Sequence, residues 1–221
     1  MAQLPTGSPR LGPLAICLVA GLAIGLGTGA AVFSSGDDKG SGSTKADTHA
    51  IELPATLAGF RDIEEVTATR TKQPKSLQQQ RDHQQQLRTD TVAAYRKAFG
   101  GAAAAYRGYS NDSLDKMPYV IAVRAEAPGL TIGPVVDPAY FELATPDREV
   151  KAFGDVQCEI FWSPPALKGE TPNPDDAITQ NCRRSGSGTT VFVGGGGFDG
   201  AANQQLMVAL TNAAWTTVSG H

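Results

Sequence analysis

Histidine and cysteine are scarce in this chain of 221 residues, which has only three of each. The histidines are His49, His83 and His221, and none of them stands beside a predicted strand end that could form a pocket. Hydrolases that activate a serine or cysteine need a positioned imidazole as base, and imidazole is also the commonest metal ligand. The sequence therefore argues against these enzymes and predicts no metal and no cofactor.

An excess of positive charge is also lacking. Nineteen Lys and Arg residues stand against 22 Asp and Glu residues, which gives a formal net charge of −3. Proteins that bind nucleic acids neutralise phosphates with clustered basic side chains. We therefore expect no nucleic-acid partner.

Charge is absent altogether from residues 11–33, a run of 23 residues that contains no Asp, Glu, Lys or Arg. As a helix this run would be roughly 34 Å long, which is enough to cross the hydrocarbon core of a bilayer. Arg10 precedes the run, and Asp37 and Asp38 follow it. By the positive-inside rule, we expect residues 1–10 to be a cytoplasmic tail and the rest of the chain to be extracytoplasmic.

A cleaved signal peptide is the alternative interpretation of the same run. Ala30 and Ala31 are small residues of the kind that a signal peptidase accepts. The run is long for the apolar part of a signal peptide, which favours a retained transmembrane helix. Either interpretation exports the bulk of the chain, as a single-pass membrane protein or as a secreted one.

Three glycines recur at every fourth position within the run, at Gly21, Gly25 and Gly29. This spacing places them on one stripe of a helix, where two helices could approach closely and form a homodimer. The alternative is that glycine is simply common in membrane helices. Residues 34–50 follow, rich in Gly, Ser and charge, and we expect them to be a disordered tether.

The remaining residues, 51–221, are predicted to form one extracytoplasmic α+β domain with an antiparallel sheet and flanking helices. Residues 51–60 are expected to dock on this domain. Apolar spacing of three to four residues predicts helices over 76–99 and 201–218. Alternation predicts strands over residues 102–109, 119–125, 131–136, 149–162, 178–184 and 189–194. The strand over 149–162 is expected to be a single one, bent at Gly154.

Two of the three cysteines, Cys158 and Cys182, fall in predicted strands of the exported domain, whereas Cys17 lies in the apolar run. Outside the cytoplasm such a pair is expected to form a disulfide. The spacing is not that of a CxxC redox motif, and no histidine lies near enough in sequence for a zinc site.

Two patterns offer further chemistry. Residues 195–200 match the glycine fingerprint of dinucleotide-binding loops, but the second strand and acidic residue that the fingerprint requires do not follow the helix predicted over 201–218. We therefore expect a flexible loop there. Five carboxylates lie close in sequence, and two of them could flank a glycosidic bond or simply face solvent. They are Glu142, Asp147, Glu149, Asp155 and Glu159.

The order of these features resembles a known kind of protein. An apolar anchor and a polar tether precede an entry segment with Leu53, Pro54, Leu57 and Gly59, and then the segments 153–158, 182–184 and 190–193. This arrangement resembles the uncharacterised single-pass extracytoplasmic proteins of high-GC Gram-positive bacteria. The resemblance implies a place in the cell envelope and no particular activity.

The sequence thus favours a non-enzymatic binding module, tethered to the membrane through residues 11–33, that acts on an envelope protein partner. One alternative is a carboxylate-dependent envelope hydrolase that acts on glycans. Another is a secreted carrier of a lipid or small ligand, which would need a deep apolar cavity.

Overall fold

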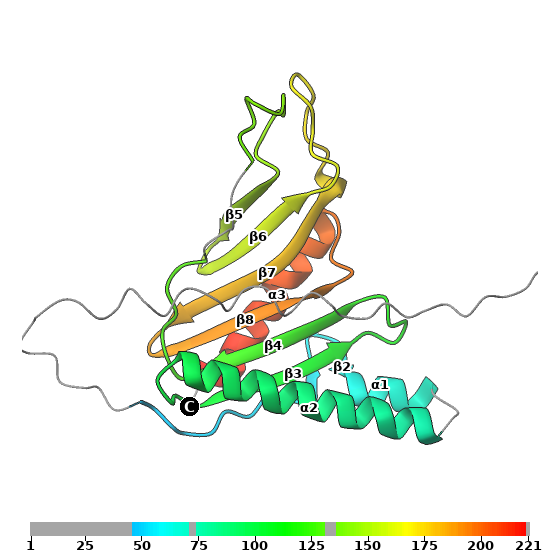
Figure 1. The fold of residues 1–221 in the computed structure, drawn as a ribbon, viewed down its shortest axis with the longest axis vertical. Coiled ribbons are helices and arrows are strands. Elements are labelled where there is room, and N and C mark those ends of the chain that lie inside the picture. The colour runs from blue at the N-terminus through cyan, green and yellow to red at the C-terminus, as the bar shows by residue number, and fades with distance from the viewer. Residues whose placement is uncertain (1–45, 71–73, 131–135, 220–221) are drawn as a thin grey trace, which may run out of the picture. The chain divides into compact units, whose positions relative to one another are not determined.

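Residues 46–70, 74–130 and 136–219 are described by the structure, which is a computed structural model (Figure 1). The predicted cytoplasmic tail 1–10, the transmembrane helix 11–33 with Gly21, Gly25 and Gly29, and most of the tether 34–50 lie outside these residues. So does most of the predicted strand 131–136. Among the described helices, none combines the length and the apolar character that a bilayer span requires.

One eight-stranded antiparallel sheet and three α-helices make up the domain, and this confirms the α+β prediction. The strands run in the order β1-β2-β3-β4-β8-β7-β6-β5 across the sheet. Along the chain the elements are β1 (Thr56–Leu57), β2 (Phe60–Asp62), α1 (Ile63–Arg70), α2 (Pro74–Ala98), β3 (Ala104–Ser110), β4 (Met117–Val123), β5 (Arg148–Phe153), β6 (Val156–Trp162), a 3₁₀ turn (Pro174–Asp176), β7 (Ala177–Gly186), β8 (Thr189–Gly196) and α3 (Ala201–Ser219).

Each face of the sheet has its own hydrophobic core, because successive side chains of a strand point to opposite faces. On one face, Val120 and Val193 pack with Met207 and Leu210 of α3, and all four are buried. On the other face, Ile121 and Val123 lie in a smaller cluster that includes Tyr95 of α2. Figure 1 shows α2 in front of the sheet and α3 behind it.

The prediction of one long strand over 149–162 is wrong. The chain reverses at Gly154 and Asp155, so that β5 and β6 form a hairpin in which Phe153 pairs with Val156. Gly154 adopts a φ of 61°, a left-handed conformation that a glycine takes at little cost. Because the loop has two residues, Phe153 and Val156 point to the same face of the sheet, and the alternation of buried positions changes phase at the turn.

The N-terminal part of the fold also differs from the predictions. Residues 56–70 contribute β1, β2 and α1, whereas the sequence predicts only that residues 51–60 dock on the domain.

After β4, the chain runs from the middle of the sheet to its edge strand β5. On the way, the carbonyl of Ala127 accepts a hydrogen bond from Nη1 of Arg183 at 2.9 Å. Arg183 of β7 is buried there, and desolvation lowers the pKa of its guanidinium.

Candidate functional site

Two loops extend beyond the ends of β5, β6 and β7, at the top of Figure 1. They comprise residues 137–147, which lead into β5, and residues 163–176, which connect β6 to β7. Leu143 and Leu167 form a β-bridge between them. The amide of Ala144 donates to the carbonyl of Ala166 at 2.9 Å, and the amide of Lys168 donates to the carbonyl of Glu142 at 2.7 Å. We call this pair of loops the loop arm.

The loop arm is held in shape by local contacts as well. A carboxylate oxygen of Asp137 accepts from the amide of Ala139 at 2.9 Å, and one of Glu170 accepts from the amide of Leu167 at 2.9 Å. Each proline fixes its own φ and restricts the residue before it. The arm contains six of the 14 prolines of the chain, namely Pro138, Pro146, Pro164, Pro165, Pro172 and Pro174. Its backbone therefore has little conformational freedom.

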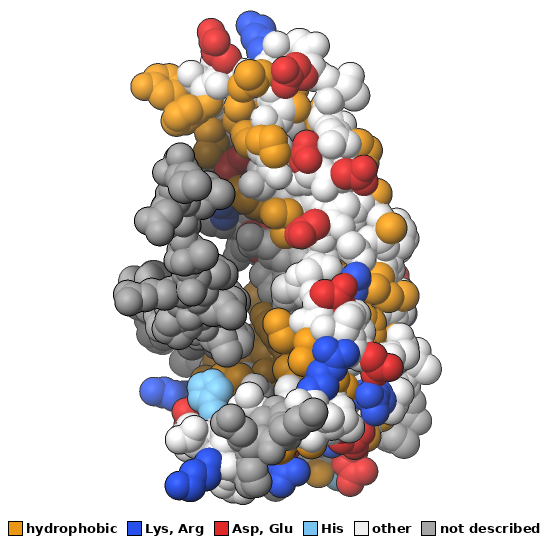
Figure 2. Space-filling view, turned by 90° about the vertical axis from the view of Figure 1, so that its right-hand side faces the viewer, with side chains coloured by type: hydrophobic (Ala, Val, Ile, Leu, Met, Phe, Trp, Pro, Cys, Tyr) orange, Lys and Arg blue, Asp and Glu red, His pale blue; other side chains and the backbone are white. Residues whose placement is uncertain are grey.

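Large apolar side chains are nevertheless exposed on this arm. Tyr140 is 79% exposed, Phe141 56% and Leu167 55%, and these are the large hydrophobic residues that stand out as exposed in the described parts of the chain. The two aromatic rings meet edge to face, with centroids 4.9 Å apart. We call these three residues the apolar tip. Hydrophobic side chains gather at the corresponding upper end of Figure 2.

The predictions from sequence did not identify the apolar tip. A signal for it existed, because Tyr140 and Phe141 stand together between Pro138 and Pro146, in a segment without strand or helix periodicity. Two adjacent aromatic residues in such a loop have little chance to reach a core. Exposed apolar groups that adjoin one another typically mark interaction surfaces, whereas single exposed ones need no explanation.

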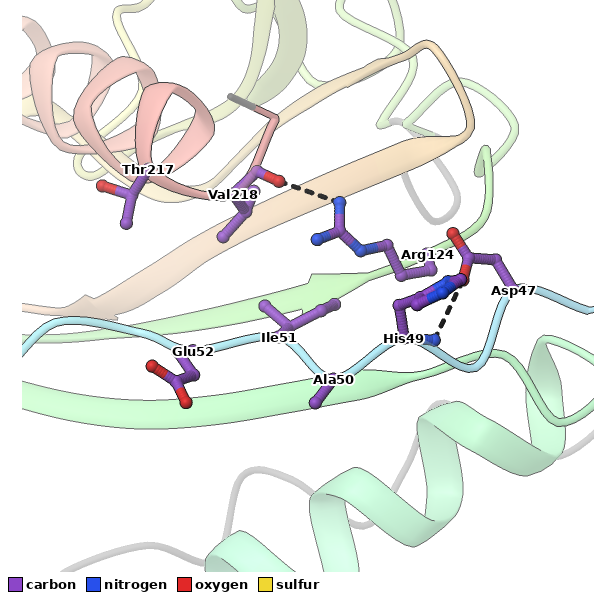
Figure 3. A pocket seen from close by; sticks show the side chains of 8 residues that line it. All are labelled: Asp47, His49, Ala50, Ile51, Glu52, Arg124, Thr217 and Val218. Atoms are coloured by element: carbon purple, nitrogen blue, oxygen red, sulfur yellow. Dashed lines mark hydrogen bonds and ion pairs between the residues drawn. The ribbon is translucent and has the colours of Figure 1, made fainter. Parts of the chain in front are cut away.

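A pocket of about 480 Å³ lies at another place, between the N-terminal described segment, the start of the crossing after β4 and the end of α3 (Figure 3). Its ionisable side chains are Asp47, His49, Glu52 and Arg124. His49 borders this pocket from the segment that precedes β1, and not from the end of a strand. The amide of Ala103 donates to the carbonyl of Asp47 at 2.8 Å, so the last residues of the predicted tether contact the domain.

The polar groups of this pocket contact one another. The amide and the ring of His49 lie 2.9 Å and 2.7 Å from a carboxylate oxygen of Asp47. These hydrogen bonds, chiefly the one from the backbone, lower the pKa of Asp47. Nη1 of Arg124 donates to the carbonyl of Val218 at 2.8 Å (Figure 3). The positive guanidinium there offsets the partial negative charge at the C-terminal end of α3. These contacts fasten the N-terminal segment and the end of α3 to the sheet.

None of the five candidate carboxylates lines this pocket. Two of them, Asp147 and Glu159, approach the same guanidinium: Nε of Arg148 lies 3.6 Å from Asp147, and Nη1 lies 4.0 Å from Glu159. Glu159 also accepts from the amide group of Asn181 at 3.3 Å. Both carboxylates thus belong to a network of ion pairs on the sheet.

The other three candidates do not join them. Asp155 lies in the β5–β6 turn and pairs with Arg184 at 2.8 Å. Glu149 is a residue of β5, and Glu142 is exposed on the loop arm with a φ of 52°. Within the described residues, no three His, Cys, Asp or Glu side chains gather closely enough to hold a metal ion.

Gly194, Gly195 and Gly197 make close contact with other parts of the chain. A Cβ on Gly194 would lie 2.6 Å from the amide oxygen of Asn181 and would overlap the hydroxyl of Tyr119. A Cβ on Gly195 would lie 2.7 Å from the Cα of Pro118. Gly194 and Gly195 therefore allow β8 to pack against its neighbours. Gly195 and Gly196, which were expected in a flexible loop, belong to β8.

Cys158 and Cys182 form the predicted disulfide, which joins β6 to β7 inside the core that α3 covers. Comparisons with protein-family models, with curated proteins and with solved structures gave no match. No relative therefore indicates a function.

Proposed function

We propose that this protein is an extracytoplasmic interaction module, anchored to the membrane by residues 11–33, which binds an envelope protein through its apolar tip. The observation that supports this proposal is the exposure of Tyr140, Phe141 and Leu167 on one constrained arm. Aromatic residues are enriched at the centres of protein interfaces, where they bury large areas at low entropic cost.

The constrained backbone of the arm adds to this argument. A flexible loop loses conformational entropy when it binds, and this loss reduces the affinity. In the loop arm, the bridge between Leu143 and Leu167 and the prolines fix the backbone before any partner arrives. Part of the conformational entropy of the arm is therefore already lost on folding and is not lost again on binding.

Two observations favour the extracytoplasmic location. The uncharged run 11–33 is followed by acidic rather than basic residues, which favours export of the C-terminal part. The disulfide between Cys158 and Cys182 is of a kind that persists outside the reducing cytoplasm. Labelling of intact cells checks the topology: a membrane-impermeant amine reagent should modify Lys168 and spare the amino terminus.

The place where the chain enters the domain also fits the proposal. Residues 46–50 lie at one end of the described domain, and the loop arm lies at the opposite end (Figure 1). An anchor that precedes residue 46 would therefore leave the apolar tip free to meet partners away from the attachment point.

A photo-crosslinking amino acid tests the proposal directly. It is placed at Tyr140, and in a control at the exposed Gln80 of α2, in the full chain expressed in its source cells. We expect a protein adduct of defined mass from position 140 that disappears when Phe141→Ser is added, and no such adduct from position 80. The absence of a Phe141-dependent adduct would overturn the proposal.

A further inference from the structure

We propose that the partner of the apolar tip is a protein, different from this chain, with an apolar socket whose rim carries Lys and Arg. This inference rests on the proposed function and specifies the chemistry of the partner. The observation that leads to it is the charge of the loop arm.

Negative charge is concentrated on the loop arm. Its two segments, 137–147 and 163–176, contain six Asp and Glu residues and one Lys residue, a net of five negative charges. The whole chain has a formal net charge of −3, so the rest of it is slightly positive. The arm is therefore distinctly acidic within a chain that is close to neutral.

Several of these carboxylates adjoin the apolar tip. Glu142 follows Phe141 in sequence, is exposed, and has a φ of 52°, which is uncommon for a residue with a side chain. Glu170 is exposed and accepts from the amide of Leu167, and the exposed Asp137 accepts from the amide that precedes Tyr140. Lys168 is the one basic residue of the arm. Figure 2 shows acidic side chains beside the hydrophobic ones at this end.

Complementary potentials speed encounter and exclude wrong partners, so an acidic rim around an apolar centre fits a basic rim around an apolar socket. An anionic lipid surface would repel this arm, because loops that bind such surfaces usually present Lys and Arg. A second copy of this chain is also disfavoured, because its own arm is acidic and the rest of it carries a net of only two positive charges.

The test uses the crosslinker at Tyr140 in washed envelope membranes that contain the full-length protein. The carboxylates of Glu142 and Glu170 are neutralised together as Glu142→Gln and Glu170→Gln. Glutamine keeps an acceptor oxygen for the amide of Leu167 and the same size at position 142, so that charge is the main change. The matched control is Glu65→Gln at an exposed position of α1.

We expect the double variant to lower the yield of the protein adduct about threefold or more at low salt, and Glu65→Gln to leave it unchanged. Raising the salt concentration should lower the adduct yield of the wild type and reduce the difference in yield between the wild type and the double variant. The basic residues of the socket should then be found by mass spectrometry beside the crosslinked peptide.

Other outcomes would overturn the inference. If the adduct depends on Phe141 but not on the two carboxylates or on salt, the proposed function stands and the basic rim is wrong. An adduct with the mass of a dimer would identify a second copy, and an adduct with lipid alone would identify the bilayer. If position 140 yields no adduct that depends on Phe141, the proposed function itself fails.

Discussion

Cys158 and Cys182 lie directly opposite each other on β6 and β7, with Cα atoms 4.0 Å apart and both side chains fully buried. The disulfide between them closes the loop of chain that contains residues 163–176, which form half of the loop arm. The bond therefore fastens the strands from which this part of the arm projects.

Replacing both cysteines with alanine should destabilise the domain. A cross-link across 24 residues contributes on the order of 3 kcal/mol in the chain-entropy model. We expect the free energy of unfolding in urea, followed by tryptophan fluorescence, to fall by about 2–5 kcal/mol. Cys17→Ala is the control and should leave it unchanged. A double variant as stable as the wild type would show that the bond contributes nothing.

Gly194→Ala should also destabilise the domain, because the new methyl group would meet Tyr119 and Asn181 in neighbouring strands. Overpacking of this kind costs about 1–3 kcal/mol. Gly196→Ala is a matched control in the same strand, since a Cβ there meets nothing within 4 Å. Urea unfolding of the two variants measures the difference, and equal stability would contradict the close approach of β4 and β7 to Gly194.

Alkaline pH should unfold the domain through its partly or fully buried tyrosines. Burial raises the pKa of Tyr95 and of Tyr106 to about 12, and it also raises the pKa of Tyr109. In the unfolded chain a tyrosine ionises near pH 10. The folded state thus holds these protons more tightly, and its stability is fully present below about pH 10 and is lost as pH rises towards 12.

Tyrosinate absorbance measures this effect. In the native protein, we expect a late phase of ionisation that coincides with the loss of tertiary structure seen by near-ultraviolet circular dichroism. In the protein unfolded by urea, we expect all tyrosines to ionise in one phase near pH 10. A late phase that precedes unfolding would show that these phenols ionise inside the folded domain.

Phe141→Ser should leave stability nearly unchanged, because this side chain is more than half exposed. We expect a change in the free energy of unfolding within about 0.5 kcal/mol. Phe198, which is 1% exposed and packs against Phe60, provides the contrast: Phe198→Ala should cost about 3–5 kcal/mol. If the two variants unfolded alike, the tip residue would be part of a core, and the proposed interface would lose its basis.

The loop arm should be protected against hydrogen exchange. The amides of Ala144 and Lys168 donate to carbonyls of the facing loop, and exchange requires that these bonds open. We expect both amides to exchange at least about tenfold more slowly than an unstructured peptide. Exchange at the unstructured rate would show a flexible arm, and the argument from low entropic cost would fail.

Local sequence patterns predicted the helices near 76–99 and 201–218 and most of the longer strands, because each of these segments repeats its apolar residues with one period. The β5–β6 hairpin was missed although Gly154 and Asp155 are a typical two-residue turn. Val150 and Ala152 continue the parity of the buried residues of β6, and this favoured a single bent strand. The reversal instead places them on the opposite face of the sheet. The strands β1 and β2 have two and three residues, which is too short for any period.

Sequence alone determined the composition of the chain, its charge, its uncharged run and the presence of Cys158 and Cys182, since these depend on residue type and local order. Only the tertiary structure decided which distant residues meet. It placed Leu167 beside the segment that contains Tyr140 and Phe141, and it brought Asp147 and Glu159 to one arginine. Such contacts depend on the order of the strands in the sheet, which packing between elements far apart in the chain selects.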